Sequence, residues 1–280
     1  MIASAARIRQ QRLPYLLLLP AGIFLAVFFL VPLGEVVWLS VSEPRLSLAN
    51  YTGLLTDTLY ARVLVNTFVT ALTVTLACLL LGYPLAYAIA RTGGVFGTVL
   101  VSIVAMSFWT SFLVRTYAWM VILGNRGPVV AALKALGWDP PPLLLFTRFS
   151  SVLAMVHILA PFMIMALYAV MKKIDPAVLR AAASLGAKPL GIFRHVFLPL
   201  SAPGIVSGST LVFVICLGFY VTPVLIGSPR ELMIAGLIGD QMEQFLAFGP
   251  ASAMALVLLA ATLGVLAVYN RFFGLDRLWG

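Results

Sequence analysis

Six stretches of this chain are long and apolar enough to cross a lipid bilayer as helices, and they constrain its fold more than any other feature. A helix needs about 20 consecutive apolar residues to span the hydrocarbon core. Runs of this kind occupy residues 14–39, 62–90, 96–124, 149–171, 200–226 and 250–273. Charged residues make up only 10% of the chain, against about 25% in soluble domains. We therefore predict an all-α integral membrane protein with six transmembrane helices.

The first apolar run follows Arg7, Arg9 and Arg12, a pattern that signal peptides share with first transmembrane helices. The run is longer than the apolar region of a signal peptide, and no clear small-residue cleavage site follows it. We therefore expect this run to remain in the protein as a transmembrane helix.

The lysine and arginine residues divide unevenly between the segments that join these runs, and this predicts the orientation of the chain. With both termini in the cytoplasm, the cytoplasmic segments hold Arg7, Arg9, Arg12, Arg91, Lys172, Lys173, Arg180, Lys188, Arg194, Arg271 and Arg277. Their only carboxylates are Asp175 and Asp276, whereas charges balance on the other side, so the net charge of +9 lies on the cytoplasmic face. The charge matches anionic membrane lipid and calls for no nucleic acid as a partner.

The cytoplasmic segment between the fourth and fifth runs has the pattern of a short capped helix. Asp175 and Pro176 form a helix start, with aspartate as the N-cap and proline at the first helical position. Gly186 is placed to end this helix, and a second helical piece at about 189–196 leads into the fifth run. An exposed helix of this kind lies on lipid or docks a soluble partner, and the residues alone favour docking only narrowly.

This segment resembles the EAA loop of the permease subunits of ATP-binding-cassette (ABC) importers. That loop reads Glu-Ala-Ala, three residues, Gly, nine residues, and then a hydrophobic residue, any residue, Leu and Pro. The positions that match or fit common variants are Ala181, Ala182, Gly186, Ala187, Phe193, Val196, Leu198 and Pro199. Arg180 stands where the family has glutamate, so the acidic contact of that glutamate does not carry over.

The resemblance implies a type I ABC importer permease fold in which this loop is a cytoplasmic coupling helix that contacts an ATPase subunit. The residues expected to form that contact are Arg180, Ala181, Ala182, Leu185, Gly186, Ala187, Phe193 and Pro199. The implied organisation is an N-terminal part over residues 1–60, a permease domain over 61–273 with the coupling loop at 172–198, and a cytoplasmic tail over 274–280.

Three other stretches are similar to permeases of the spermidine/putrescine type. They are SFWTSFLVRTYAWMVILGNRGPV (107–129), APFMIMALYAVMKKID (160–175) and GFYVTPVLIGSPRELMIAGLI (218–238). This resemblance implies a bacterial cytoplasmic membrane protein that works with two ATPase subunits, a second, related permease and an extracytoplasmic solute-binding protein. Members of the family carry polyamines, and their relatives carry opines, amino-acid derivatives or phosphonates.

The chain carries no sign of its own ATPase or of another catalytic site. None of its lysines follows a glycine, so it has no GxxxxGK phosphate loop, and HExxH, GxSxG and CxxC are also absent. His157, His195, Cys78 and Cys216 are expected to be structural. We therefore expect no catalytic residue, metal or cofactor in this chain, with ATP and Mg²⁺ bound by the partner. A passive channel or secondary transporter without an ATPase remains the alternative.

Polar and aromatic residues in the third and fifth runs are candidates for contact with the solute, because polar groups inside a membrane usually face a cavity or a partner helix. As one continuous helix, the third run would place Ser107, Ser111 and Arg115 on one face. The candidate pathway residues are Trp109, Ser111, Arg115, Tyr117, Tyr220 and Thr222. Arg115 either extends to the outer headgroups, lines a cavity, or forms a structural ion pair, and the aromatic residues either pack the core or cage a cation.

The charges in the runs leave the solute open. The third, fourth and fifth runs contain no carboxylate, and Glu35 in the first run is the only acidic residue within the predicted spans. An arginine in the pathway favours a solute with a carboxylate or phosphonate group, whereas the resemblance favours polyamines. Small residues four apart, such as Gly204 with Gly208 and Ala260 with Gly264, predict close helix packing.

Overall fold

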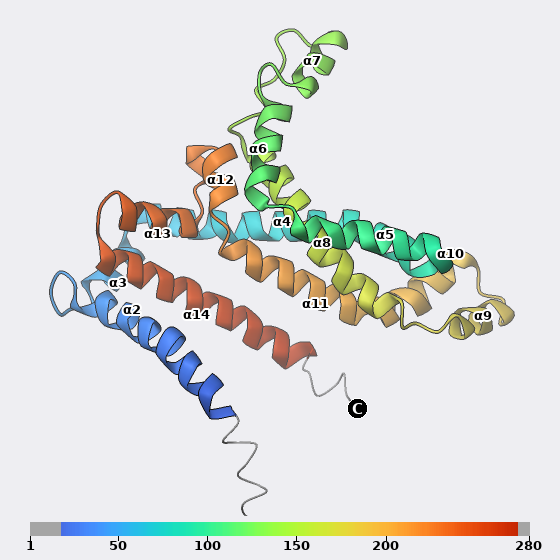
Figure 1. The fold of residues 1–280 in the computed structure, drawn as a ribbon, viewed down its shortest axis with the longest axis horizontal. Coiled ribbons are helices and arrows are strands. Elements are labelled where there is room, and N and C mark those ends of the chain that lie inside the picture. The colour runs from blue at the N-terminus through green and yellow to red at the C-terminus, as the bar shows by residue number, and fades with distance from the viewer. Residues whose placement is uncertain (1–17, 274–280) are drawn as a thin grey trace, which may run out of the picture. The chain divides into compact units, whose positions relative to one another are not determined.

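The computed structural model describes residues 18–273 of the chain, and every regular element in that range is a helix (Figure 1). Five helical segments are long and apolar enough to cross a membrane: Leu18–Ser42, Thr58–Arg91, Arg148–Met171, Pro189–Leu217 and Phe248–Arg271. A sixth apolar region consists of two helical parts, Gly94–Trp109 and Phe112–Ala135, which bend by 95° at the break between them. The prediction of an all-α membrane protein is confirmed, and the described residues contain six spans when the bent pair is counted as one.

The described residues form two compact units. The first unit comprises the chain up to Asp57 together with Ile238–Val257, and the second comprises Thr58–Leu237 together with the chain from Leu258. In the first unit, α2 (Val31–Ser42) and α3 (Ala49–Thr56) form a hairpin. The amide of Asn50 closes the hairpin by donating to the backbone carbonyls of Ser40 (2.9 Å) and Glu43 (2.8 Å).

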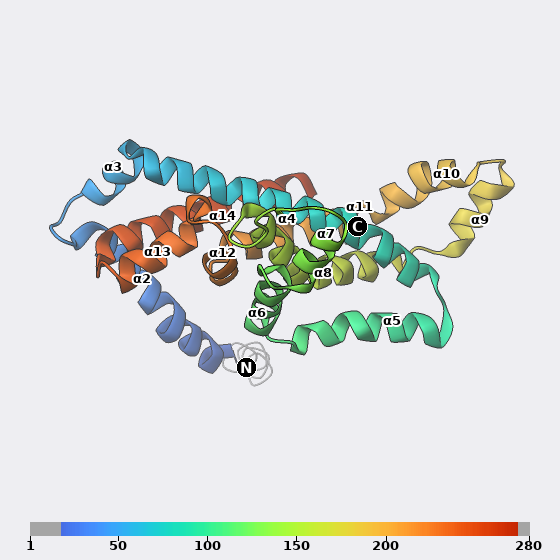
Figure 2. The same ribbon diagram turned by 90° about the horizontal axis from the view of Figure 1, so that it is seen from above.

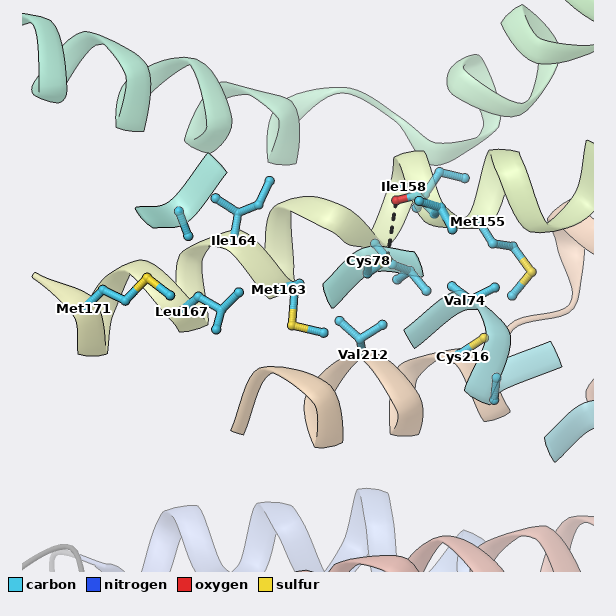
Figure 3. Packing of buried hydrophobic residues seen from close by; sticks show 14 of the residues in the cluster. Val74, Cys78, Met155, Ile158, Met163, Ile164, Leu167, Met171, Val212 and Cys216 are labelled. Carbon is cyan, nitrogen blue, oxygen red and sulfur yellow. Dashed lines mark hydrogen bonds between the residues drawn. The ribbon is translucent and has the colours of Figure 1, made fainter. Parts of the chain in front are cut away.

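The second unit is built around three packed helices, α4 (Thr58–Arg91), α8 (Arg148–Met171) and α11 (Leu198–Leu217). Figure 3 shows the sulfur-containing side chains of Cys78, Met155, Met163 and Cys216 in the space between these helices. Both cysteines are fully buried, as predicted, and the Cys78 thiol donates to the backbone carbonyl of Val156 at 3.7 Å. Flexible methionines and small side chains fill the irregular gaps between closely spaced helices.

Small residues set how closely α11 approaches α8, as the sequence pattern predicts. A Cβ atom added at Gly208 would lie 2.9 Å from the Met163 sulfur and 3.2 Å from the Ala166 Cβ. One added at Gly204 would lie 3.1 Å from the Cβ of Val170. Gly264 differs, because nothing lies within 4 Å of its added Cβ in the described part of the chain. The pattern therefore identifies a close helix contact at Gly204 and Gly208, and also at Gly82 of α4, whose added Cβ would lie 3.3 Å from Met163 and Ile164 of α8.

The prediction of one continuous helix over 96–124 is wrong. Helix α5 (Gly94–Met106) continues into a short 3₁₀ turn, η2 (Ser107–Trp109), and α6 (Phe112–Leu123) then starts in a new direction. The backbone is extended at Thr110 and Ser111, and the Ser107 hydroxyl donates to the Val104 carbonyl at 2.6 Å. Ser and Thr side chains favour such breaks because they compete for backbone hydrogen bonds. As a result, Ser107, Ser111 and Arg115 do not share a helical face.

The prediction of one helix over 200–226 is also wrong, at both ends. The span begins at Pro189 and passes through a turn of π-helix, η3 (Phe193–Phe197), before α11. It ends at Leu217, and α12 (Val221–Ile226) follows Gly218 as a separate short helix. Thr222, one of the candidate pathway residues, therefore lies in α12 and outside the span.

Two of the remaining helices belong to spans: α10 (Pro189–Ile192) starts the span that α11 completes, and α14 (Phe248–Phe273) contains the last span. The others lie between spans and are α9 (Pro176–Ser184), η4 (Pro229–Glu231), α13 (Ile234–Glu243) and α7 (Pro128–Ala135), which follows α6 in the bent region. Helix α7 begins at Pro128, which occupies one of the first helical positions. Figures 1 and 2 both show α9 and α10 projecting beyond one end of α8 and α11. This projection places the segment that resembles the EAA loop where a partner can reach it.

Candidate coupling loop and solute pathway

Helix α9 begins as its sequence predicts. Asp175 is the N-cap, and its carboxylate accepts a hydrogen bond from the Ala177 backbone N–H at 2.7 Å, while Pro176 occupies the first helical position. Proline is well placed here because its missing N–H would have no partner inside the helix. The sequence alone therefore fixes the first residue of α9.

The end of α9 is a Schellman motif. The Gly186 N–H donates to the Ala183 carbonyl at 2.9 Å, and the Ala187 N–H donates to the Ala182 carbonyl at 3.2 Å. Gly186 has a φ of +85°, the left-handed conformation that this motif requires and that glycine adopts most readily. The predicted role of Gly186 as the residue that ends the helix is confirmed.

Helix α9 is anchored to the core by one residue and exposes most of the others. Leu179 is buried in the core cluster, whereas Arg180, Ala181 and Ala187 are exposed. Leu185 is 89% exposed and Leu190 is 78% exposed. Both side chains are large and apolar, and both lie exposed near the ends of short helices. Together they form a surface suited to burial against a partner.

Aromatic side chains connect the coupling segment to the membrane-spanning core. Phe193 meets Tyr83 and Tyr87 edge-to-face, with both ring centroids 6.0 Å away, and Phe197 meets Tyr87 at 4.8 Å. The Tyr83 hydroxyl also hydrogen-bonds the Ser201 hydroxyl at 2.8 Å. These contacts join the segment that follows α9 to α4.

The two tyrosines were not among the residues singled out from the sequence, although their spacing carried a signal. Tyr83 and Tyr87 lie four residues apart, and side chains at this spacing share one helix face. Pro199, which the EAA resemblance includes, is exposed at the start of α11. The aromatic contacts with α4 come instead from Phe193 and Phe197, the first and last residues of η3.

The candidate pathway residues divide into an exposed and a buried group. Trp109 is 83% exposed, Tyr117 56% and Tyr220 44%, and Ser111 is also exposed. Thr222 is fully buried, and its hydroxyl hydrogen-bonds the hydroxyl of the equally buried Thr116 at 2.9 Å. This pair joins α12 to α6, which is a structural contact.

Arg115 supports the sharp bend between α5 and α6. One terminal guanidinium nitrogen donates to the Thr110 carbonyl at 2.8 Å, inside the break, and the other reaches the Ile158 carbonyl on α8 at 3.5 Å. Its Nε is buried without a hydrogen-bond partner in the described structure. One turn further on, the Trp119 indole N–H donates to His157 Nδ1 at 3.1 Å, which adds a second link from α6 to α8.

The site contains no arrangement typical of metal chemistry. In the part of the chain that the structure describes, no three His, Cys, Asp or Glu side chains are grouped closely enough to hold a metal ion. What the structure offers is a bundle of apolar helices, a bent span and an exposed capped helix at one end. These features are those of a multi-pass helical membrane protein.

The chain belongs to the family of binding-protein-dependent transport system inner membrane components, whose sequence profile matches residues 79–273. The spermidine/putrescine transport system permease protein PotB of Escherichia coli (strain K12) is 36% identical over 228 residues, which cover 80% of this chain and 82% of PotB. PotB of Haemophilus influenzae is 32% identical over 260 residues, which cover 92% of this chain and 88% of that protein.

Solved structures show the same fold. A chain of a bacterial ABC transporter that imports the acidic polysaccharide alginate matches with a TM-score of 0.72 at 20% identity, covering 96% of this chain and 99% of that chain. A chain of the methionine ABC transporter MetNI matches with a TM-score of 0.56 at 17% identity, covering 78% and 97%. This protein is thus a permease subunit of an ABC importer and a multi-pass component of the inner membrane.

Proposed function

We propose that this permease subunit imports a polyamine or a closely related small cation. The observation that carries the proposal is the 36% identity to a spermidine/putrescine permease over 80% of the chain. Identity at this level over most of both chains covers the bent span and the coupling loop together. The proposal therefore rests on a resemblance of the whole permease.

The surroundings of Arg115 remove an objection to a cationic solute. From the sequence, an arginine in the pathway favours an anionic solute. In the structure, two guanidinium nitrogens of Arg115 point to the carbonyls of Thr110 and Ile158, so a structural role accounts for this residue. The exposed rings of Trp109, Tyr117 and Tyr220 suit a cation, because an aromatic face attracts positive charge.

We also propose that α9 and α10 form the contact with an ATPase subunit. The exposed Leu185 and Leu190 supply the apolar surface for it, and Gly186, the glycine of the EAA spacing, ends α9 in a Schellman motif. Arg180 replaces the family's glutamate and is exposed, so the ATPase should present a carboxylate or a neutral acceptor to it. ATP and Mg²⁺ would bind in that subunit.

The proposed assembly contains two ATPase subunits, a second permease that is a related chain, and an extracytoplasmic solute-binding protein. Both termini and the coupling loop lie in the cytoplasm, as the excess of lysine and arginine there indicates. The opposite side carries the connections near residues 43–61, 125–148 and 227–249. These connections are the surfaces available to the binding protein.

Reconstitution of the complete transporter tests the solute and the mechanism together. The permeases, the ATPase and the binding protein would be placed in liposomes, and uptake of labelled spermidine measured with and without ATP. We expect ATP-dependent uptake that putrescine reduces and that octopine, an opine with carboxylates, does not. Uptake without ATP at the same rate would identify a passive channel. Competition by octopine alone would reject the polyamine proposal and retain the importer.

A further inference from the structure

A small cavity lies between the first part of α4 and the connection from α12 to α13. Its volume is about 280 Å³. The residues that line it are Leu59, Arg62, Val63, Asn66, Pro229, Arg230, Leu232 and Leu237. In the proposed orientation, this cavity is on the extracytoplasmic side of the membrane, and the coupling loop is on the cytoplasmic side. The floor is mostly apolar, and two exposed arginines stand at its edge.

The cavity is held in shape by hydrogen bonds between its two walls. The Asn66 amide on α4 donates to the Leu232 carbonyl at 3.1 Å, and the Ile234 N–H donates to the Thr67 hydroxyl at 2.8 Å. The Ser228 hydroxyl also accepts from the Arg230 N–H at 3.3 Å, which fixes the start of η4. Because these contacts fix the connection at several points, the cavity exists before anything binds to it.

The chemistry of the cavity suits one carboxylate on a short apolar stem. Arg62 and Arg230 line the same small space, and guanidinium groups bind carboxylates through paired, charge-assisted hydrogen bonds. Glu231 follows Arg230 but is not among the lining residues. The methylene groups of a glutamate side chain would pack on Leu59, Val63 and Leu232.

The size of the cavity favours a side chain over a free solute. Pockets that enclose small molecules usually measure about 300–1,000 Å³, and this one is at the lower limit and open to solvent. The family to which the chain belongs is dependent on a binding protein, which must contact the permease from this side. We infer that the Arg62–Arg230 cavity receives an acidic side chain of the extracytoplasmic binding protein when that protein docks.

This inference rests on the proposed function, and titration of the binding protein tests it separately. The complete transporter would be reconstituted in vesicles of phosphatidylcholine, and ATP hydrolysis measured against increasing concentrations of the spermidine-loaded binding protein. We expect Arg62→Glu and Arg230→Glu each to raise the half-saturating concentration by tenfold or more, with the maximal rate unchanged. Arg126→Glu is the matched control, because Arg126 is exposed on the same predicted side and outside the cavity.

A photo-crosslinking residue supplies a second measurement that does not depend on activity. Placed at position 230, it should crosslink to the binding protein, whereas the same residue at position 126 should not. An unchanged half-saturating concentration in both cavity variants would overturn the inference. A lower maximal rate at an unchanged half-saturating concentration would assign the cavity to the solute, which also overturns it. If the wild-type transporter shows no stimulation by any loaded binding protein, the proposed function itself has failed.

Discussion

Substituting Gly186 with alanine should weaken coupling to the ATPase by an amount that the backbone geometry sets. Gly186 has a φ of +85°, and nothing lies within 4 Å of the Cβ that alanine would add. The cost is therefore purely conformational. It is about 1–2 kcal/mol for a residue with a side chain in the left-handed region, which corresponds to a change of about 5- to 30-fold in an equilibrium. When the ATPase binds only a loop in which the Schellman motif is formed, this whole cost weakens the binding of the ATPase.

The assay is the dissociation constant of the purified ATPase subunit for the detergent-solubilised permease, with uptake per assembled complex as the functional measure. We expect the dissociation constant to rise by about 5- to 30-fold in Gly186→Ala, while the amount of permease in the membrane stays the same. Gly186→Asn should cost less, because asparagine tolerates the left-handed conformation better than alanine does.

Gly191→Ala is the matched control within the same loop. Gly191 lies in α10, has an ordinary negative φ, and also has nothing within 4 Å of the added Cβ. Alanine there should leave binding unchanged or strengthen it slightly, because alanine favours a helix over glycine by about 1 kcal/mol. Equal dissociation constants for wild type and Gly186→Ala would refute the reasoning, as would an equal loss in Gly186→Ala and Gly186→Asn.

Three further substitutions test other contacts. Gly208→Val should lower the thermal midpoint of the detergent-solubilised permease, since overpacking costs about 1–3 kcal/mol. Gly264→Val is the control and should leave the midpoint unchanged, because no described atom lies within 4 Å of the added Cβ. Equal midpoints for the two variants would contradict the α8–α11 contact. If a carboxylate of the ATPase faces Arg180, Arg180→Glu should weaken ATPase binding about tenfold, or about 1.4 kcal/mol. Unchanged co-purification of the ATPase with this variant would place Arg180 in solvent. Arg115→Ala removes the donor from two carbonyls, so the stability of the permease should fall by about 1–3 kcal/mol, measured as a lower thermal midpoint, with spermidine selectivity unchanged. Altered selectivity would return this residue to the solute pathway.

The membrane-spanning segments could be predicted from the sequence because their formation is a local property. A backbone inside a bilayer must satisfy its own hydrogen bonds, so a sufficiently long apolar run becomes a helix whatever it packs against. The same is true of α9, whose start at Asp175 and end at Gly186 depend on residues within a few positions. The bounds of α9 were therefore predictable from nearby residues, and the assignment of this loop to an ATPase contact stays a proposal based on its resemblance to the EAA loop.

The bend in the third span was decided by the tertiary structure. An apolar run does not show whether it continues straight or breaks, and the direction of α6 is stabilised by contacts with α8 and α12. The Thr116–Thr222 hydrogen bond joins residues 106 positions apart, and no local pattern predicts such a pair. For this reason the sequence placed Thr222 in the pathway, whereas the structure buries it between two helices.

The aromatic link and the arginine cavity depend on folding in the same way. Tyr83 and Tyr87 contact the coupling segment only in the folded chain, where Phe193 lies against both rings. Arg62 and Arg230 are two scattered charges in the sequence, and they line one cavity because Asn66 and Thr67 hold the α12–α13 connection against α4. The sequence thus determined which segments cross the membrane and where α9 begins and ends. The packing of distant segments decided which side chains meet, because those contacts form only once the helices are in place.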